Sequence, residues 1–231
     1  MKFNITGYKK KSEHISDKGV TSIVYLMDCV EAMKQIPNDA FCLSIVDQPY
    51  GINISRAGGY YHVKGKGQAN PHTKKDWDSG IPTAEYWQEL FRVSKNQIVW
   101  GGNYMTEFLS PSRCWIFWDK MKFVDNYADG ELAWTSFDRN TKKVGIQHHG
   151  FLTKDGKSIH PTQKPVALYE WLIKNYAKES DKILDTHGGS MSSRIAAHKA
   201  NLPFMGFELD EDYFKASVKR FEQHTNQTRL F

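Results

Sequence analysis

Four consecutive residues, Asp47-Gln48-Pro49-Tyr50, have side chains suited to holding a planar base by its amino group. They follow the apolar run 41–46, so they would lie at the carboxyl end of a buried strand. An exocyclic amine on adenine or cytosine is a poor nucleophile because its lone pair is delocalised into the ring. The Asp47 carboxylate and the backbone carbonyl of residue 48 could accept its two hydrogens and draw the nitrogen out of the plane. Pro49 keeps residue 48 extended, and Tyr50 could stack on the base, which is worth about 1 to 3 kcal/mol. The pattern indicates activation of an amine by positioning and electrostatics, with no metal site needed.

A second group of residues, in the C-terminal half, has the form of a nucleotide-binding turn. Residues 183–190 read Ile-Leu-Asp-Thr-His-Gly-Gly-Ser and precede a predicted helix and a strand that ends in Glu208. The two glycines let the backbone approach a ligand closely, and Glu208 could accept hydrogen bonds from both hydroxyls of a ribose. A dehydrogenase would use such an acid too, but the Gly-x-Gly-x-x-Gly pattern and the full Walker pattern Gly-x-x-x-x-Gly-Lys-Ser/Thr are both missing from the sequence.

Between these two groups lies the hexapeptide His160-Pro161-Thr162-Gln163-Lys164-Pro165. With it, the sequence resembles the amino-methylating DNA methyltransferases of the permuted beta class. The signatures of that class are Asp-Pro-Pro-Tyr, His-Pro-Thr-Gln-Lys-Pro and Asp-Pro-Phe-x-Gly-Ser-Gly-Thr, and the resemblance spans nearly the whole chain. It implies methyl transfer from S-adenosylmethionine to the exocyclic amine of a base flipped out of double-stranded DNA. Adenine N6 is favoured because Asp stands first in the catalytic tetrapeptide; cytosine N4 and a catalytically silent DNA- or cofactor-binding relative remain alternatives.

The resemblance also assigns residues to the cofactor. The methionine end of the cofactor would contact Asp185, His187, Gly189 and Ser190. The ribose would contact Glu208, and the adenine would contact Asp28 and Cys29. Thr162 and Lys164 would close over the amino acid moiety, and His160, in the same hexapeptide, is also assigned to the cofactor site. Three sites depart from the family pattern. Gln48 replaces a proline, Thr186-His187 replace Pro-Phe, and Met191 replaces a glycine, where its side chain could narrow the pocket.

The elements that must position these residues alternate between strands and helices. The apolar patterns predict strands at 21–27, 41–46, 97–100, 114–118, 131–135, 182–185 and 204–208, and helices at 30–35, 83–93, 166–177, 190–200 and 211–222. This alternation predicts an α/β, doubly wound, mostly parallel sheet in one domain, 1–231. Only 46 residues follow Asp185, so N-terminal strands must complete the sheet. The fold is therefore expected to be a circularly permuted, Rossmann-like S-adenosylmethionine-dependent methyltransferase fold.

Two segments have the composition of surface loops that face a polyanion. Residues 51–80 contain six glycines and five Lys or Arg residues, which predicts a mobile basic loop. Residues 119–158 occupy the family's target-recognition slot. The basic residues expected to contact DNA are Arg56, Lys64, Lys66, Arg139, Lys142 and Lys143.

Composition sets further bounds. The net charge of +5 permits a polyanionic partner without demanding one. The three cysteines have no paired or metal-ligand spacing, and no apolar stretch has the length of a membrane span. These features favour a cytoplasmic protein of a prokaryotic cell or a phage. The resemblance makes a homodimer a candidate assembly and restriction-modification a candidate setting, but the sequence names no restriction partner.

Overall fold

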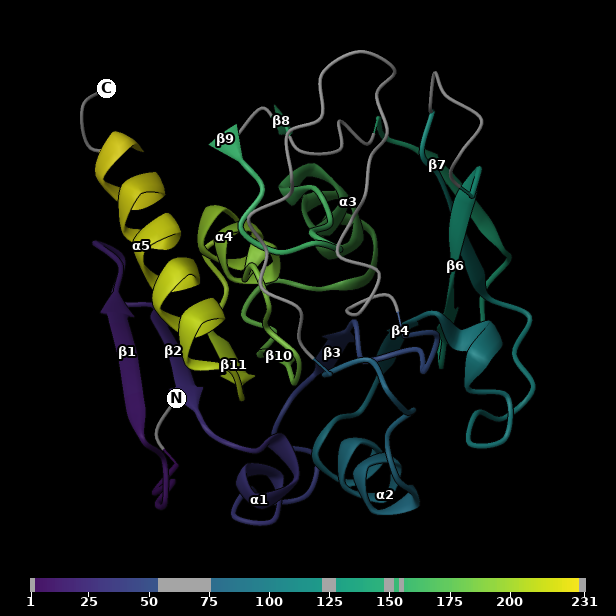
Figure 1. The fold of residues 1–231 in the computed structure, drawn as a ribbon, viewed down its shortest axis with the longest axis horizontal. Helices are drawn as coiled ribbons and strands as arrows, with labels where there is room; N and C mark the ends of the chain where they lie inside the picture. The colour runs from purple at the N-terminus through teal and green to yellow at the C-terminus, as the bar shows by residue number, and fades with distance from the viewer. Residues whose placement is uncertain (1–2, 54–75, 122–127, 148–151, 154–155, 229–231) are drawn as a thin grey trace.

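The computed structural model describes residues 3–53, 76–121, 128–147, 152–153 and 156–228 (Figure 1). In this part of the chain, nine strands form one sheet and two short strands, β8 (Leu152–Thr153) and β9 (Gly156–Lys157), form a hairpin. Across the large sheet, the strands are β1 (Lys10–Ile15), β2 (Thr21–Leu26), β11 (Phe204–Glu208), β10 (Ile183–Asp185), β3 (Leu43–Val46), β4 (Gln97–Trp100), β6 (Gly130–Thr135), β5 (Trp115–Asp119) and β7 (Lys142–Gly145).

The centre of this sheet is parallel. Strands β2, β11, β10, β3 and β4 pair in parallel, whereas β6 is antiparallel to both of its neighbours and β1 is antiparallel to β2. β3 from the N-terminal half lies directly beside β10 from the C-terminal half. This confirms the predicted mostly parallel, permuted arrangement, in which the N-terminal strands complete a sheet that the C-terminal strands begin.

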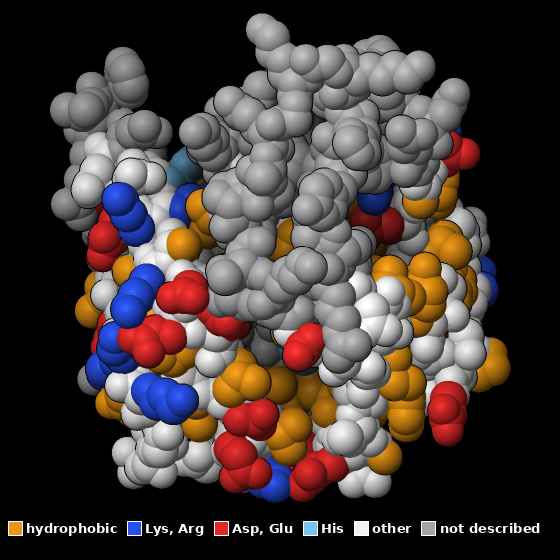
Figure 2. All heavy atoms as spheres, viewed as in Figure 1, with side chains coloured by type: hydrophobic (Ala, Val, Ile, Leu, Met, Phe, Trp, Pro, Cys, Tyr) orange, Lys and Arg blue, Asp and Glu red, His pale blue; other side chains and the backbone are white. Residues whose placement is uncertain are grey.

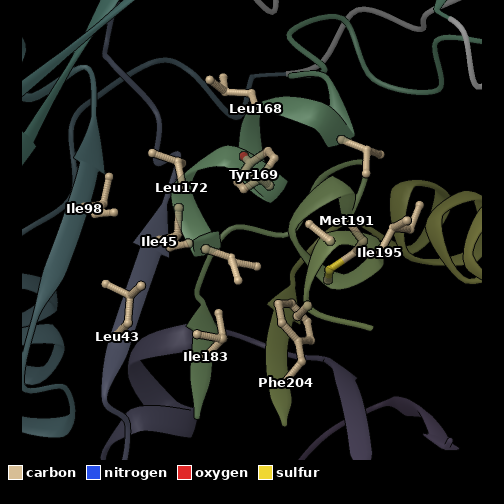
Figure 3. Packing of buried hydrophobic residues seen from close by; sticks show 14 of the residues in the cluster. Leu43, Ile45, Ile98, Leu168, Tyr169, Leu172, Ile183, Met191, Ile195 and Phe204 are labelled. Atoms are coloured by element: carbon tan, nitrogen blue, oxygen red, sulfur yellow. The ribbon is translucent and has the colours of Figure 1, made fainter. Parts of the chain in front are cut away.

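Helices cover both faces of the sheet. α1 (Cys29–Met33) and α2 (Ala84–Val93) lie on one face, and α3 (Val166–Tyr176), α4 (Ser192–Lys199) and α5 (Glu211–Thr228) lie on the other (Figure 1). Successive strand residues point to opposite faces. Leu43 and Ile45 therefore pack with α3 and α4 (Figure 3), whereas Val46 packs in the second core, against α1 and α2. Each fully buried aliphatic side chain of this kind contributes about 1.5 to 3 kcal/mol.

The connections around β10 and β3 create a crevice. From β10 the chain passes through α4 to β11 on one side, and from β3 it passes through α2 to β4 on the other. Where the order of strands reverses in this way, a crevice opens at their carboxyl ends. Asp185 ends β10, Glu208 ends β11, and Asp47 directly follows β3. The topology thus brings the two predicted groups of residues to one edge of the sheet.

Most predicted elements match the observed ones within two residues, and the differences have simple causes. β1 was not predicted, because its residues are polar and mostly exposed, as is common for an edge strand that pairs on one side only. β7 was also not predicted, since Val144 is the only buried residue in it. None of the helices in the described part of the chain combines the length and the apolar character that a membrane crossing requires.

Candidate active site

A cavity of about 1060 Å³ opens at the carboxyl ends of the central strands. It is lined by all but one of the residues predicted for catalysis and for the cofactor: Asp28, Cys29, Asp47, Gln48, Pro49, Tyr50, His160, Thr162, Lys164, His187, Gly189, Ser190 and Glu208. The exception is Asp185. Its carboxylate is buried and accepts hydrogen bonds from the His187 amide, at 3.1 Å, and from the Ser193 hydroxyl. Burial raises the pKa of Asp185 to about 7. Asp185 therefore holds the turn that contains Gly188 and Gly189 through hydrogen bonds to His187 and Ser193, without lining the cavity.

The tetrapeptide 47–50 is held by hydrogen bonds at both ends. Oδ1 of Asp47 accepts the Tyr50 hydroxyl at 2.8 Å and the Lys164 ammonium at 2.6 Å. Burial and the Asp47 charge raise the pKa of Tyr50 well above its usual value, so its hydroxyl stays protonated and donates. The buried Asp78 carboxylate accepts the backbone N–H groups of Tyr50 and Gly51. Within the described residues, Oδ2 of Asp47 receives no hydrogen bond, so it remains the open acceptor of this carboxylate.

Gln48 anchors the tetrapeptide to the neighbouring strand. Its side chain is 2% exposed, and Nε2 donates to the backbone carbonyl of Trp100, the last residue of β4, at 2.8 Å. A proline at this position could not make that bond. The substitution therefore replaces ring rigidity by a hydrogen bond that ties residue 48 to the sheet.

Lys164 lies between two carboxylates. Its side chain is 3% exposed, and its ammonium contacts Oδ1 of Asp47 and, at 2.9 Å, Oε2 of Glu131 in β6. Oε1 of Glu131 in turn contacts Lys120 at 2.6 Å. Burial alone would lower the pKa of Lys164, but Asp47 and Glu131 outweigh this effect and raise it. The resemblance assigned Lys164 to the amino acid part of the cofactor, which stays a prediction; in the structure its ammonium pairs with the Asp47 carboxylate.

The Tyr50 ring is enclosed by its neighbours. The Tyr104 ring stacks on it with centroids 5.2 Å apart and planes at 17°. Gly101 adopts φ +65°, and a Cβ atom there would lie 2.3 Å from the Tyr50 ring. Tyr104 is 46% exposed and lines the cavity. Tyr104 therefore covers a face of the ring that was predicted to stack on a base.

The cofactor half of the cavity is built on Glu208. Its two carboxylate oxygens accept the backbone N–H groups of Gly189, at 2.6 Å, and of Asp210, at 2.8 Å. Burial raises the pKa of Glu208, and these two hydrogen bonds oppose that rise. On the same side, the Asp28 carboxylate caps α1 by accepting the amides of Val30 and Glu31. Both acids are thus oriented by main-chain donors.

Of the two departures from the family pattern at Met191 and His187, only His187 lines the cavity. Met191 keeps a left-handed backbone, φ +54°, but its side chain turns into the core (Figure 3) and does not line the cavity. The Met191 side chain occupies the space beside Gly188, and a Cβ atom added to Gly188 would clash with the Met191 methyl group. The expectation that Met191 narrows the pocket is therefore wrong. His187 does line the cavity, and burial lowers its pKa to about 4, so it is neutral near pH 7.

Comparison with known proteins finds similar DNA methylases. Residues 110–219 match the N6/N4 DNA methylase family. The chain is also 25% identical over 214 residues to YubD of Escherichia coli strain K12, which is named as a methylase; the match covers 84% of this chain and 87% of YubD. These matches support the resemblance to the amino-methylating DNA methyltransferases.

Solved structures agree with this assignment at the level of the fold. The complex of M1.HpyAVI with S-adenosylmethionine superposes with a TM-score of 0.59 and 18% identity, covering 85% of this chain and 97% of that one. The cytosine-N4-specific PvuII DNA methyltransferase gives a TM-score of 0.57 and 14% identity, covering 88% and 89%. These likenesses confirm the predicted methyltransferase fold.

Of the residues predicted to contact DNA, those that the structure describes do not line the cavity. Arg56, Lys64 and Lys66 lie outside the described residues. The Arg139 guanidinium donates to the Asn175 carbonyl at 2.8 Å at the end of α3, and Lys143 pairs with Asp119 at 2.9 Å. Lys142 is exposed on β7. Elsewhere on the surface, basic and acidic side chains alternate along the edge formed by β1 and α5 (Figure 2), where Lys10 and Lys215 both pair with Glu211.

Several cavity residues were not singled out from the sequence, among them Glu131, Lys120 and Tyr104. Glu131 and Lys120 come from the segment assigned to target recognition, and Tyr104 from the 3-10 turn η1 (Gly102–Tyr104) after β4. Glu131 carried a detectable signal, because a single acid stands at the start of the otherwise apolar run Leu132-Ala133-Trp134. A charge beside buried strand residues indicates a partner or a site. Lys120 and Tyr104 lie in polar turns, where nothing in the sequence distinguishes them.

Proposed function

We propose that this chain is a DNA methyltransferase that transfers a methyl group from S-adenosylmethionine to the exocyclic amine of a flipped base, with adenine N6 as the preferred target. The observation that carries the proposal is one cavity with two parts. One part holds the open Oδ2 of Asp47, and the other holds Glu208 and the Gly188–Ser190 turn. The preference for adenine rests on the resemblance of the tetrapeptide, with Asp47 in first place.

The cofactor half fits S-adenosylmethionine in size and in chemistry. A volume of about 1060 Å³ is at the upper end of ligand sites, which leaves room for a nucleoside-sized group and a base together. A carboxylate has about four acceptor positions, and two on Glu208 are used by main-chain donors. The remaining positions suit two ribose hydroxyls. Asp28 and Cys29 would then meet the adenine, and Thr162, Gly189 and Ser190 the amino acid end.

The chain's own residues account for activation of the target amine. When bound, S-adenosylmethionine supplies a methyl group on a positively charged sulfur. Oδ2 of Asp47 accepts one amine hydrogen and the backbone carbonyl of Gln48 the other, which favours a tetrahedral nitrogen whose lone pair is no longer conjugated with the ring. Tyr50 and Lys164 hold Oδ1 and so orient the carboxylate. As the nitrogen takes the methyl group it loses a proton, and Oδ2 is the acceptor within reach.

Double-stranded DNA is the proposed substrate, and the rest of the chain is assigned accordingly. The amine cannot be reached inside a duplex, so the base leaves the stack before reaction. We assign the segments 51–80 and 119–158, with Lys142 and Lys143, to DNA contacts, within a single domain that acts alone or as a homodimer. Such a substrate implies the cytoplasm of a prokaryotic cell, as a host or phage gene product.

Identification of the product tests this proposal. Unmethylated DNA is incubated with the protein and S-adenosylmethionine carrying a labelled methyl group, and the digested nucleosides are separated. We expect label in N6-methyladenine. Label in N4-methylcytosine would keep the methyltransferase and reject the adenine preference. Binding of the cofactor, measured by thermal shift, without any labelled nucleoside would instead favour a catalytically silent relative.

A further inference from the structure

A buried chain of charges links the catalytic carboxylate to the β5–β6 hairpin. It runs from Asp47 to Lys164, on to Glu131 in β6, and ends at Lys120, directly after β5, with contacts of 2.6, 2.9 and 2.6 Å. The Tyr50 hydroxyl lies beside the middle of this chain, 3.2 Å from the Lys164 ammonium and 3.4 Å from Oε2 of Glu131. Two acids and two bases alternate, so the group is neutral as a whole.

The two carboxylates are used differently. Both oxygens of Glu131 are paired, one with each lysine. Burial would raise the pKa of Glu131, but Lys164 and Lys120 outweigh burial and lower it to about 2, so Glu131 stays charged throughout the working pH range. For Asp47, in contrast, burial raises the pKa despite Lys164, and within the described residues its Oδ2 is open. One carboxylate is thus a permanent counterion and the other can take up a proton.

We propose that Glu131 is a positioning residue for methyl transfer, which holds Lys164 on Oδ1 of Asp47 and remains the counterion of that buried ammonium after Asp47 is protonated. The inference rests on the proposed function. Lys120 pairs with the other carboxylate oxygen of Glu131, and its side chain is only 14% exposed. Glu131 and Lys120 belong to the segment 119–158, which was assigned to target recognition from the sequence, and this segment thereby contributes to methyl transfer.

The chemistry of the step shows why a second counterion is needed. The nitrogen lone pair forms the new bond to the methyl carbon, and the electrons of the carbon–sulfur bond leave with sulfur. One N–H bond then breaks, its electrons stay on nitrogen, and the proton moves to Oδ2 of Asp47. Asp47 is now neutral, so Lys164, which is 3% exposed, would be a buried charge without a partner if Glu131 were absent. An unpaired buried charge is strongly unfavourable.

Opposite shifts in the pH profile test this assignment. The groups that face Asp47 from the elements around it are Tyr50, Lys164, Tyr169 of α3, Glu131 of β6 and Asp185 of β10. Glu131 raises the pKa of Asp47 by repulsion, so Glu131→Gln should move the acid limb of kcat/KM to lower pH. Lys120→Gln removes the cation that neutralises Glu131, and should move the same limb to higher pH. A role in folding alone would not move the two variants in opposite directions.

The loss of kcat should distinguish replacement of Glu131 from replacement of an exposed surface glutamate. Glu131→Gln should lower kcat by roughly 10- to 100-fold, as expected for a charge-assisted interaction, and leave KM for cofactor and DNA within about threefold. Glu179→Gln is the matched control, because Glu179 is exposed and lies at the opposite end of the strands, just before β10. It should behave like the unmodified protein. Circular dichroism checks that each variant is folded. If Glu131→Gln does not fold, the shift of the acid limb in Lys120→Gln tests the assignment.

A titration without cofactor separates this inference from the proposed function. The pKa of Asp47 is read from the carboxyl carbon signal of the isotope-labelled protein, assigned with Asp47→Asn. It should fall in Glu131→Gln and rise in Lys120→Gln. If the unmodified protein transfers methyl groups but the Asp47 pKa, kcat and acid limb are unchanged in Glu131→Gln, the inference is overturned and the function stands. If the pKa moves as expected but no methyl group is transferred, the electrostatic linkage stands, whereas the proposed function and the role of Glu131 in methyl transfer fall.

Discussion

Replacement of Lys164 by methionine should destabilise the protein by removing one charge from a buried array. Methionine keeps an unbranched apolar side chain but leaves Asp47 and Glu131 facing each other without the cation that lies 2.6 and 2.9 Å from them. Breaking a buried ion pair by removing one partner costs about 3 to 5 kcal/mol. For a domain of this size, each kcal/mol lowers the unfolding midpoint by roughly 2 to 4 °C, so we expect a fall of roughly 6 to 20 °C.

The loss should depend on pH with a definite sign. Burial already raises the pKa of Asp47 above its unfolded value, and Lys164 opposes that rise. Without Lys164, the folded-state pKa of Asp47 rises further. A carboxyl whose pKa is higher in the folded state destabilises the protein when pH is above that pKa, and the penalty is relieved as pH falls through it. The deficit of Lys164→Met should therefore be smaller at pH 5 than at pH 8.

Calorimetry of the cofactor-free protein at the two pH values measures both effects. Lys10→Met is the matched control, because Lys10 pairs with Glu211 at a similar distance, 2.7 Å, but both side chains are about half exposed. Such a surface pair contributes little, so the control should unfold close to the unmodified protein at either pH. An Lys164→Met variant as stable as the control, or with a deficit equal at pH 5 and pH 8, would refute the description of this cluster.

Three further outcomes follow from the site and its surroundings. Glu208→Ala should weaken S-adenosylmethionine binding roughly 10- to 100-fold, because the ribose loses a charged acceptor; equal affinity by calorimetry would remove Glu208 from the site. Met191→Gly should lower the free energy of unfolding by about 1 to 3 kcal/mol, since the cavity left in the core outweighs relief of the left-handed backbone; a variant stabilised against urea would contradict this. Replacing Lys142 and Lys143 together by alanine should lower the slope of log affinity for DNA against log salt by up to about 2 and weaken all sequences alike. Relaxed sequence preference would instead mean that these lysines reach base edges.

Local patterns were sufficient to predict the central sheet. The runs 97–100 and 204–208 are mostly apolar, as buried parallel strands are, and the observed β4 and β11 have the same bounds. β1 escaped prediction because its residues alternate between exposed and half-buried, and pairing with β2 decides its conformation. Tertiary contacts of this kind override local preference.

The charge chain at the site could not be predicted, because it depends on distant parts of the chain. Lys164 and Asp47 are 117 positions apart, and nothing local indicates that the ammonium meets Oδ1. Glu131 reaches Lys164 because β6 is inserted antiparallel between β4 and β5. The role of Met191 was mistaken for the same reason. Its backbone matches the left-handed conformation that glycine favours, but the direction of its side chain depends on the space beside Gly188.

In the proposed mechanism, Oδ2 of Asp47 activates the target amine. The most direct test compares the single-turnover rate of methyl transfer to DNA by the unmodified protein and by Asp47→Ala, with cofactor affinity measured on both. We predict that transfer falls at least 10- to 100-fold, while affinity for S-adenosylmethionine changes little, because a hydrogen bond to a charged group is worth roughly 1.5 to 3 kcal/mol. Transfer by Asp47→Ala at the rate of the unmodified protein would contradict the account.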